Sequence, residues 1–197
     1  VCNFAEFKIY CLGLNEAVTQ YIASKAIGEK PHRKNNESIS IYTINDKYYP
    51  YLTSLVIQLL FFVGEKNLIK SAIDGTVDFE NDLYNTFEGN TNKILSNFDA
   101  ILDENNEEKR SEEKIIQLYM ETQKMMCMTY FDKIYIRIDT LKEIEEYTHK
   151  LNEYGKIVGR MLENNELNDE INEYTNKMES KLNKKYIDLY AKQSKHS

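Results

Sequence analysis

The chain has 197 residues, of which 42% are hydrophobic and 12% aromatic, and its 25 Lys and Arg against 32 Asp and Glu give a net charge of −7. Such a chain can bury a core, which excludes wholesale disorder. Because phosphate binding needs clustered Lys and Arg, and the sequence shows no basic cluster, we expect no nucleic-acid partner. Two prolines and seven glycines are too few for the turns of an all-β fold. The composition favours an all-α chain.

The N-terminal part is predicted to form a helical lobe. Apolar residues recur at helical spacing in a helix that begins at Asn15, whose side chain can cap it, and that ends before Gly28. A polar connector over 29–47 follows, and within it Ser38 to Ile44 alternates enough to permit a short strand. Further helices are expected from about Pro50 to Val63, and over 65–73, 78–87 and 91–102.

No segment is expected to span a membrane. The longest apolar stretch, Tyr51 to Val63, is interrupted by Gln58 and two hydroxyl residues. It is shorter than the roughly 20 apolar residues that a span needs, so it indicates a buried helix. Three cysteines without a CxxC pair predict buried thiols, not a disulfide framework or a cysteine zinc site. The compartment stays open between cytoplasmic and secreted.

The segment 104–110 is predicted to link the helical lobe, residues 1–103, to a second helical unit, residues 111–197. It is charged and has no apolar residue, which is typical of a linker. Over 111–197 the helical pattern predicts a three-helix bundle or a coiled-coil-like hairpin of long helices. Its first helix is expected over 111–137.

Two signals delimit the other long helices. Thr140 and Glu143 have the spacing of a capping box, which predicts a helix start, and Gly155 and Gly159 are expected inside that helix, weakening its end. In the last helix, apolar residues step by three or four positions from Leu167 to Leu189. This seam is typical of a bundle or coiled coil, and it suits a partner helix or self-association equally well.

One carboxylate stands at the start of an otherwise apolar helix, in the sequence Gly13-Leu14-Asn15-Glu16-Ala17-Val18-Thr19-Gln20-Tyr21. Glu16 is the only acid between Glu6 and Glu29, and its apolar flanks are expected to bury it. A lone buried carboxylate normally is neutralised, pairs or coordinates a metal. Periodicity alone leaves a second interpretation, in which Glu16 is a first-turn acid that complements the helix dipole.

This segment resembles the helix that supplies the third zinc ligand in gluzincin metallopeptidases, the thermolysin-like group, in which N-E-A-x-[ST] follows the zinc-binding H-E-x-x-H helix. It is also similar to bacterial peptidase-like proteins in which a G-[LIF]-N-E-[GA]-x-T-[EQ]-[YF] helix precedes a Tyr-Pro-containing helix and a Gly-Glu pair. The resemblance covers about residues 1–75. The corresponding segments here are Gly13–Tyr21, Tyr49–Leu52 and Gly64–Glu65, in the same order.

The resemblance implies that Glu16 is the carboxylate ligand of a His-His-Glu catalytic zinc, with a fourth position left for water. It implies that Asn15 braces the turn and that Thr19, one helical turn further on, contacts the Glu16 ligand without touching the metal. It further implies a peptide or protein substrate. The candidates for a hydroxyl that stabilises the oxyanion are Tyr48, Tyr49 and Tyr51.

Two departures from the family pattern bear on activity. Gln20 stands where thermolysin-like enzymes carry an Asp that orients a zinc-bound His, and the chain has no H-E-x-x-H. Its histidines, His32, His149 and His196, include no pair at i, i+4. We therefore expect the chain to be the C-terminal part of a longer zinc peptidase-like protein whose H-E-x-x-H lies before Val1. Alone, it is expected to lack zinc and to hydrolyse no peptide bond.

Two other functions are compatible with the sequence. A non-enzymatic helical protein would use residues 111–197 to bind a partner or to self-associate, and an immunity or effector-binding protein has the acidic charge in its favour. An open groove beside Glu16 would support the peptidase interpretation. Pairing of Glu16 with Lys or Arg on a continuous surface would instead support a purely structural role.

Overall fold

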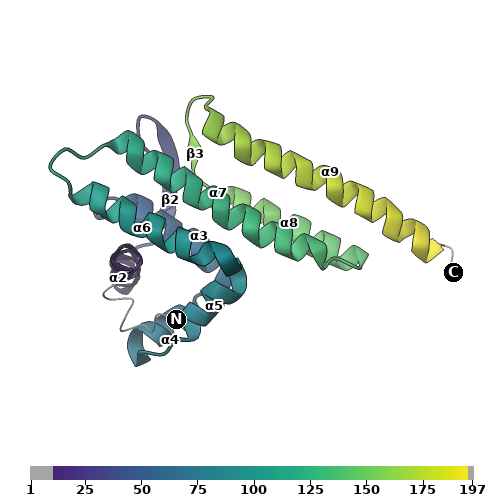
Figure 1. Ribbon diagram of the computed structural model, residues 1–197, viewed down its shortest axis with the longest axis horizontal. Coiled ribbons are helices and arrows are strands. Elements are labelled where there is room, and N and C mark those ends of the chain that lie inside the picture. Colours follow the sequence, from purple (N-terminus) through teal and green to yellow (C-terminus); the bar gives the residue numbers. More distant parts are fainter. Residues whose placement is uncertain (1–10, 195–197) are drawn as a thin grey trace.

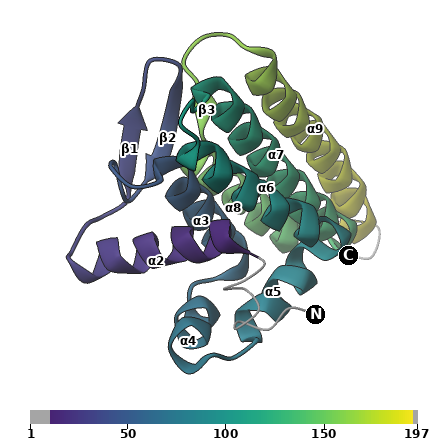
Figure 2. The ribbon, with the colours of Figure 1, turned by 60° about the vertical axis from the view of Figure 1, so that its left-hand side comes forward.

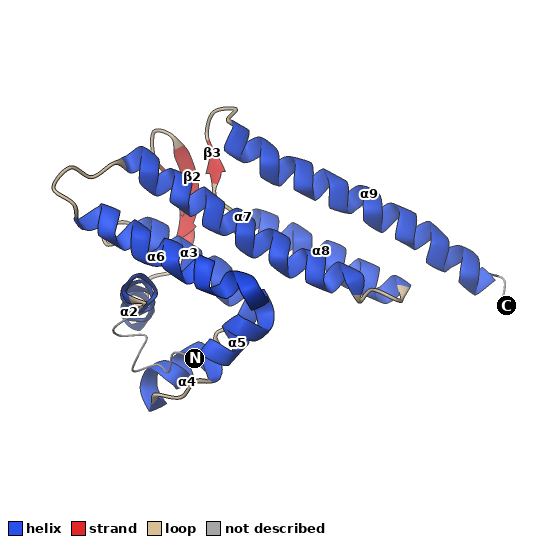
Figure 3. Ribbon diagram, in the orientation of Figure 1, coloured by secondary structure: helices blue, strands red, loops and turns tan. Residues whose placement is uncertain are grey.

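The computed structural model describes residues 11–194, so Cys2 and His196 lie outside the described residues. The described chain is mostly helical, which confirms the all-α prediction, and it adds one small three-stranded sheet (Figures 1 and 3). The elements in chain order are α2 (Leu12–Ala26), β1 (His32–Asn35), β2 (Ile39–Thr43), α3 (Pro50–Val63), α4 (Lys66–Asp74), α5 (Asp78–Phe87), the 3-10 turn η1 (Glu88–Asn90), α6 (Thr91–Asn106), α7 (Glu112–Ile136), α8 (Leu141–Ile157), β3 (Arg160–Met161) and α9 (Glu166–Ser194).

Helix α3 lies at the centre of the fold because its sequence is apolar on nearly every side. Most of its residues are buried, including the polar Ser54 and Gln58, and α2, α7, α8 and β2 all pack against it. Pro50 is its first residue and Gly64 ends it, as predicted. Among the described helices, none alone is long and apolar enough to cross a bilayer, although α3 and α4 together, bent by 112° between them, reach that length and composition.

The sheet has the order β1-β2-β3, with both pairs antiparallel. In β2, Ile39, Ile41 and Thr43 are buried and alternate with partly exposed residues, which confirms the short strand expected within 38–44. The sequence did not predict β1 or β3, because β1 is polar throughout and β3 has only two residues. Both strands form by pairing with β2.

The prediction that Gly159 lies inside a helix is wrong. Helix α8 ends at Ile157, and Val158 already has an extended backbone. The amide of Gly159 donates to Gln123 Oε1 at 2.6 Å, and its carbonyl accepts from Gln123 Nε2 at 2.9 Å. A buried side chain of α7 therefore takes the two main-chain groups of Gly159 and turns the chain toward β3.

The connection between the two helical parts is shorter than the predicted linker 104–110, because α6 continues to Asn106. Glu104 is buried, and its carboxylate accepts from the Ser111 amide at 2.9 Å and from Lys114 Nζ at 2.5 Å. These bonds fold the start of α7 back onto the end of α6. The connecting segment is 107–111, and Ser111 caps α7 by accepting from the Lys114 amide.

The three long helices lie side by side as predicted, but the first of them also belongs to the N-terminal core. Helix α7 packs along α3 and α6, α9 packs on α7 and α8, and one set of buried apolar residues runs through all of these helices. Figure 2 shows α6, α7, α8 and α9 grouped together, with the β1–β2 hairpin to one side. The predicted capping box of Thr140 and Glu143 is present at the start of α8.

The apolar seam of α9 is buried only over its first part. Tyr174, Met178 and Leu182 are buried against α7 and α8, after which α9 runs on past the loop that joins those two helices (Figure 1). In the last turns Leu189 still packs against the core, but the other apolar side chains do not. These turns expose three large apolar side chains, Tyr186 (42%), Ile187 (66%) and Tyr190 (57%).

Candidate functional site

Helix α2, which carries Glu16, begins three residues earlier than the sequence indicated. Its first residue is Leu12, so Asn15 lies within the helix and does not cap it. The Asn15 amide donates to the Cys11 carbonyl at 3.0 Å, and the Thr19 hydroxyl donates to the Asn15 carbonyl at 2.8 Å. The Asn15 bond is the ordinary main-chain bond of an α-helix, and the Thr19 side chain bonds the main chain one turn before it.

The start of α2 is fixed by Gly13, which the sequence did not place inside the helix. The Gly13 amide donates to Asp99 Oδ1 on α6 at 2.8 Å. A Cβ at position 13 would lie 2.6 Å from the Asp99 amide nitrogen and closer still to the carbonyl of Phe98. Only glycine lets the two helix backbones approach this closely. Burial raises the pKa of Asp99 and outweighs the hydrogen bond from Gly13.

The other end of α2 is fixed to the residue before α4. Tyr21 Oη donates to Glu65 Oε1 at 2.9 Å, and Lys25 Nζ donates to the same oxygen at 2.5 Å. Lys25 also lies 5.5 Å from the centre of the Tyr21 ring. Two of the segments that carry the family resemblance, Gly13–Tyr21 and Gly64–Glu65, are thus in direct contact.

The expectation that Glu16 is buried is wrong, because its side chain lies on the side of α2 that faces away from the core. Leu12, Thr19 and Ala23 share that side by helical spacing, and all three are exposed, while Glu16 is partly exposed. Among the described residues Glu16 has no hydrogen-bond or ion-pair partner. None of the five pockets described for residues 11–194 is lined by Glu16.

The early start of α2 also removes the helix-dipole explanation of Glu16. The first turn of α2 contains no acidic residue, and Glu16 lies in the second turn. Favourable interaction with a helix dipole falls off within the first turn. The carboxylate therefore has no stabilising partner of either kind in the described part of the chain.

Tyr48 is exposed, and the hydroxyls of the other two candidate tyrosines bond to residues other than Glu16. Tyr51 is buried, and its hydroxyl donates to Glu112 Oε1 at 2.5 Å and accepts from Asn36 Nδ2 at 3.0 Å. Burial, followed by the contact with Glu112, raises the pKa of Tyr51. Tyr49 precedes α3 with a left-handed backbone (φ 50°), and its hydroxyl donates to Asn106. Over residues 11–194, no hydrogen bond joins either tyrosine to Glu16.

The described residues form no cluster of metal-ligating side chains around Glu16. Across residues 11–194, no three His, Cys, Asp or Glu side chains lie close enough together to hold a metal ion. His32 contacts the Lys30 carbonyl and the Asp46 carboxylate, each at 3.0 Å, and His149 is exposed on α8. The carboxylate of Glu16 has no partner in the described part of the chain.

A buried polar network lies in the centre of the fold, and the sequence did not predict it. The Tyr119 hydroxyl accepts from Gln58 Nε2 and bonds Ser54 Oγ, both at 2.9 Å, while the Tyr154 hydroxyl donates to Gln58 Oε1 at 2.8 Å. Burial raises the pKa of Tyr119 to about 12. The only sequence signal was that Ser54 and Gln58 interrupt an apolar stretch. The network joins α3, α7 and α8 and fixes the frame on which α2 lies.

No protein-family model, curated protein or solved structure matches the chain.

Proposed function

We propose that this chain is the C-terminal part of a gluzincin-like zinc peptidase and that Glu16 is its carboxylate zinc ligand. The observation that supports this most directly is the uncommitted carboxylate of Glu16 on the outward side of α2. A carboxylate in the second turn of a helix that packs into the core gains nothing from the helix dipole. A ligand role explains why an acid stands there.

The rigidity of α2 supports the same role. Gly13 fixes the helix to α6 three residues before Glu16, and Tyr21 fixes it to Glu65 five residues after. The bond from Thr19 to the Asn15 carbonyl spans Glu16 itself. A metal ligand must be held by its surroundings close to its working position, and these contacts hold the backbone of Glu16.

In this proposal the two imidazole ligands come from an H-E-x-x-H segment that precedes Val1 in a longer protein. Zinc, when bound, polarises the scissile carbonyl and lowers the pKa of its water. Of the residues described, Glu16 binds the metal, and Asn15 and Thr19 hold its turn. Tyr51 has no part in the proposal, because its hydroxyl is already bonded to Glu112 and Asn36.

The first test is the coding sequence upstream of Val1, where we expect H-E-x-x-H within a few tens of codons. The second is the zinc content of the protein that includes that segment. Glu16→Gln should lose most of the zinc, whereas Glu179→Gln, which changes an exposed acid on α9, should retain it. A reading frame that begins near Val1, or full zinc retention in Glu16→Gln, overturns the proposal. Submicromolar zinc binding by residues 1–197 alone also contradicts it.

A second candidate function is non-enzymatic helix-mediated association. The observation in its favour is the end of α9, which leaves the bundle with Tyr186, Ile187 and Tyr190 exposed along successive turns. Exposed apolar residues that adjoin one another mark interaction sites more often than scattered ones do. The two functions are compatible, because α2 and the end of α9 share no residue.

A further inference from the structure

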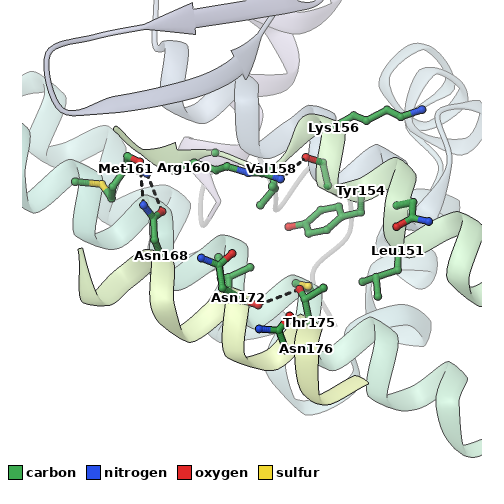
Figure 4. Close-up of a pocket in the computed structure, with 15 residues that line it drawn as sticks. Leu151, Tyr154, Lys156, Val158, Arg160, Met161, Asn168, Asn172, Thr175 and Asn176 are labelled. Atoms are coloured by element: carbon green, nitrogen blue, oxygen red, sulfur yellow. Dashed lines mark hydrogen bonds between the residues drawn. The ribbon is translucent and has the colours of Figure 1, made fainter. Parts of the chain in front are cut away.

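A polar cleft of about 720 Å³ lies between α8, β3 and α9 (Figure 4). This volume falls within the range of about 300–1,000 Å³ that is usual for ligand sites. Buried side chains of Cys127, Leu151 and Tyr154 line it on one side. Carboxamide side chains line it on others, with Asn152 on α8 and several more on α9.

The first of these carboxamides shows how such a side chain binds an extended main chain. Asn168 Oδ1 accepts from the Met161 amide at 2.8 Å, and Asn168 Nδ2 donates to the Met161 carbonyl at 2.9 Å (Figure 4). Met161 belongs to β3, an outer strand of the sheet. One asparagine of α9 therefore binds both main-chain groups of a single extended residue, as a neighbouring strand would.

The same residue type recurs at Asn172 and Asn176, so that asparagines stand at i, i+4 and i+8 on α9. Four helical residues rise about 6 Å, and two residues of an extended chain rise about 6.6 Å. The asparagine spacing thus nearly matches the distance between alternate residues of a strand. Asn172 and Asn176 both line the cleft, and neither has a hydrogen-bond partner among residues 11–194.

We propose that this cleft binds an extended peptide segment of another protein. Asn172 and Asn176 each bind the amide and the carbonyl of one peptide residue, two residues apart, as Asn168 binds Met161. The proposal concerns binding alone. Burial raises the pKa of the Cys127 thiol to about 12, so this thiol is protonated near neutral pH and is no nucleophile.

The lining of the cleft selects the side chains of the peptide. Successive residues of an extended peptide face opposite sides. The peptide residues that face the buried Leu151 and Tyr154 should therefore be apolar. Lys156 and Arg160 line the cleft as well. Arg160 donates to the Gly155 carbonyl and has no carboxylate partner within the described chain, so its charge is available to an acidic side chain. A peptide that alternates apolar and acidic residues matches this lining.

The probe is a fluorescein-labelled hexapeptide of alternating valine and glutamate, and its binding to the full chain is followed by anisotropy. Asn172→Ala and Asn176→Ala should each weaken binding roughly tenfold, because each removes two hydrogen bonds to the peptide main chain. Asn183→Ala, at an exposed position of α9 outside the cleft, should bind like the parent chain. Circular dichroism confirms that each variant is folded.

A second peptide separates main-chain recognition from charge. The same hexapeptide with N-methyl groups on alternate amides keeps every side chain but loses the donors that the asparagines need, so it should bind at least tenfold more weakly. Equal binding of the methylated peptide overturns the proposal. Unchanged binding by both asparagine variants, or no binding of the parent peptide at millimolar concentration, overturns it too. Glu16→Gln should leave this binding unchanged, so a failure here is distinct from a failure of the zinc proposal.

Discussion

The hydroxyl of Tyr21 donates a hydrogen bond to Glu65 Oε1 at 2.9 Å, across 44 positions of the sequence. Lys25, one turn further along α2, donates to the same oxygen at 2.5 Å. Burial of Glu65 works to raise its pKa, but the hydrogen bonds from Lys25 and Tyr21 outweigh burial and hold the pKa below its usual value. The contact closes α2 against the residue that precedes α4.

Tyr21→Phe removes this hydrogen bond and keeps the ring. We expect it to lower the free energy of unfolding by about 1 kcal/mol, or somewhat more because the acceptor is a carboxylate. Urea denaturation measures the change. Tyr190→Phe is the matched control, because Tyr190 is exposed and its hydroxyl bonds no other described residue. An unchanged urea midpoint for Tyr21→Phe would show that this bond does not hold α2.

Gly13→Ala tests the close approach of α2 and α6. A methyl group there meets main-chain atoms of Phe98 and Asp99, which cannot rotate away, so the two helices must separate. We expect a loss of roughly 2 kcal/mol or more in the free energy of unfolding. Gly89→Ala is the control: an added Cβ there meets open space, and stability should stay the same or rise slightly. Equal stability of the two variants would refute the close approach.

Local signals in the sequence predicted the local features of the fold. The capping box of Thr140 and Glu143 depends only on residues three apart, and Gly64 ends α3 where the apolar run stops. The same local signals placed the helix start at Asn15, after Gly13, because glycine weakens helices. The actual role of Gly13 depends on Phe98, which is 85 residues away and which no local pattern points to.

The surroundings of the candidate site residues could not be predicted from the sequence, for a similar reason. The sequence singled out Glu16 correctly as the lone acid of its helix, but its exposure depends on which side of α2 meets α3 and α6. Tyr51 looked available because tyrosines cluster at the start of α3, yet its hydroxyl faces Glu112 of another helix. The asparagines at 168, 172 and 176 recur every four residues in the sequence. Their proposed role in binding an extended chain follows only from β3, which the sequence did not predict.

Gln58→Leu tests the buried network. It leaves the hydroxyls of Tyr119 and Tyr154 without the amide that bonds both, in a site that water does not reach. We expect a loss of about 1–3 kcal/mol, because Tyr119 then keeps only Ser54 as a partner and Tyr154 keeps only the Gln123 carbonyl at 3.4 Å. Adding Tyr119→Phe to Gln58→Leu should recover part of the loss. Gln117→Leu, at an exposed position of α7, should change stability by less than about 0.5 kcal/mol.

His32 makes stability depend on pH. Its Nδ1 faces the Lys30 carbonyl and its Nε2 faces Asp46, and these contacts, the first above all, raise its pKa although burial opposes them. Because the folded pKa exceeds the unfolded value of about 6.5, the stabilisation is complete below that pH and is lost as pH rises through the folded pKa. NMR titration should place the His32 pKa above 6.5, and Asp46→Asn should lower it. A value below 6.5 would contradict these contacts.

The exposed end of α9 predicts concentration-dependent association. Tyr174, Met178 and Leu182 are buried against α7 and α8, while Tyr186, Ile187 and Tyr190 are exposed. Pairing such ends buries apolar surface worth about 25 cal/mol per Å². Sedimentation equilibrium should show association that rises with concentration and that Ile187→Ser with Tyr190→Ser abolishes. Replacing the exposed Ile73 by Ser should leave association unchanged, since Ile73 belongs to α4, which lies apart from α9 (Figure 1). A strictly monomeric parent chain would count against the association function and would leave the zinc proposal unaffected, because Glu16 lies on α2 and not on α9.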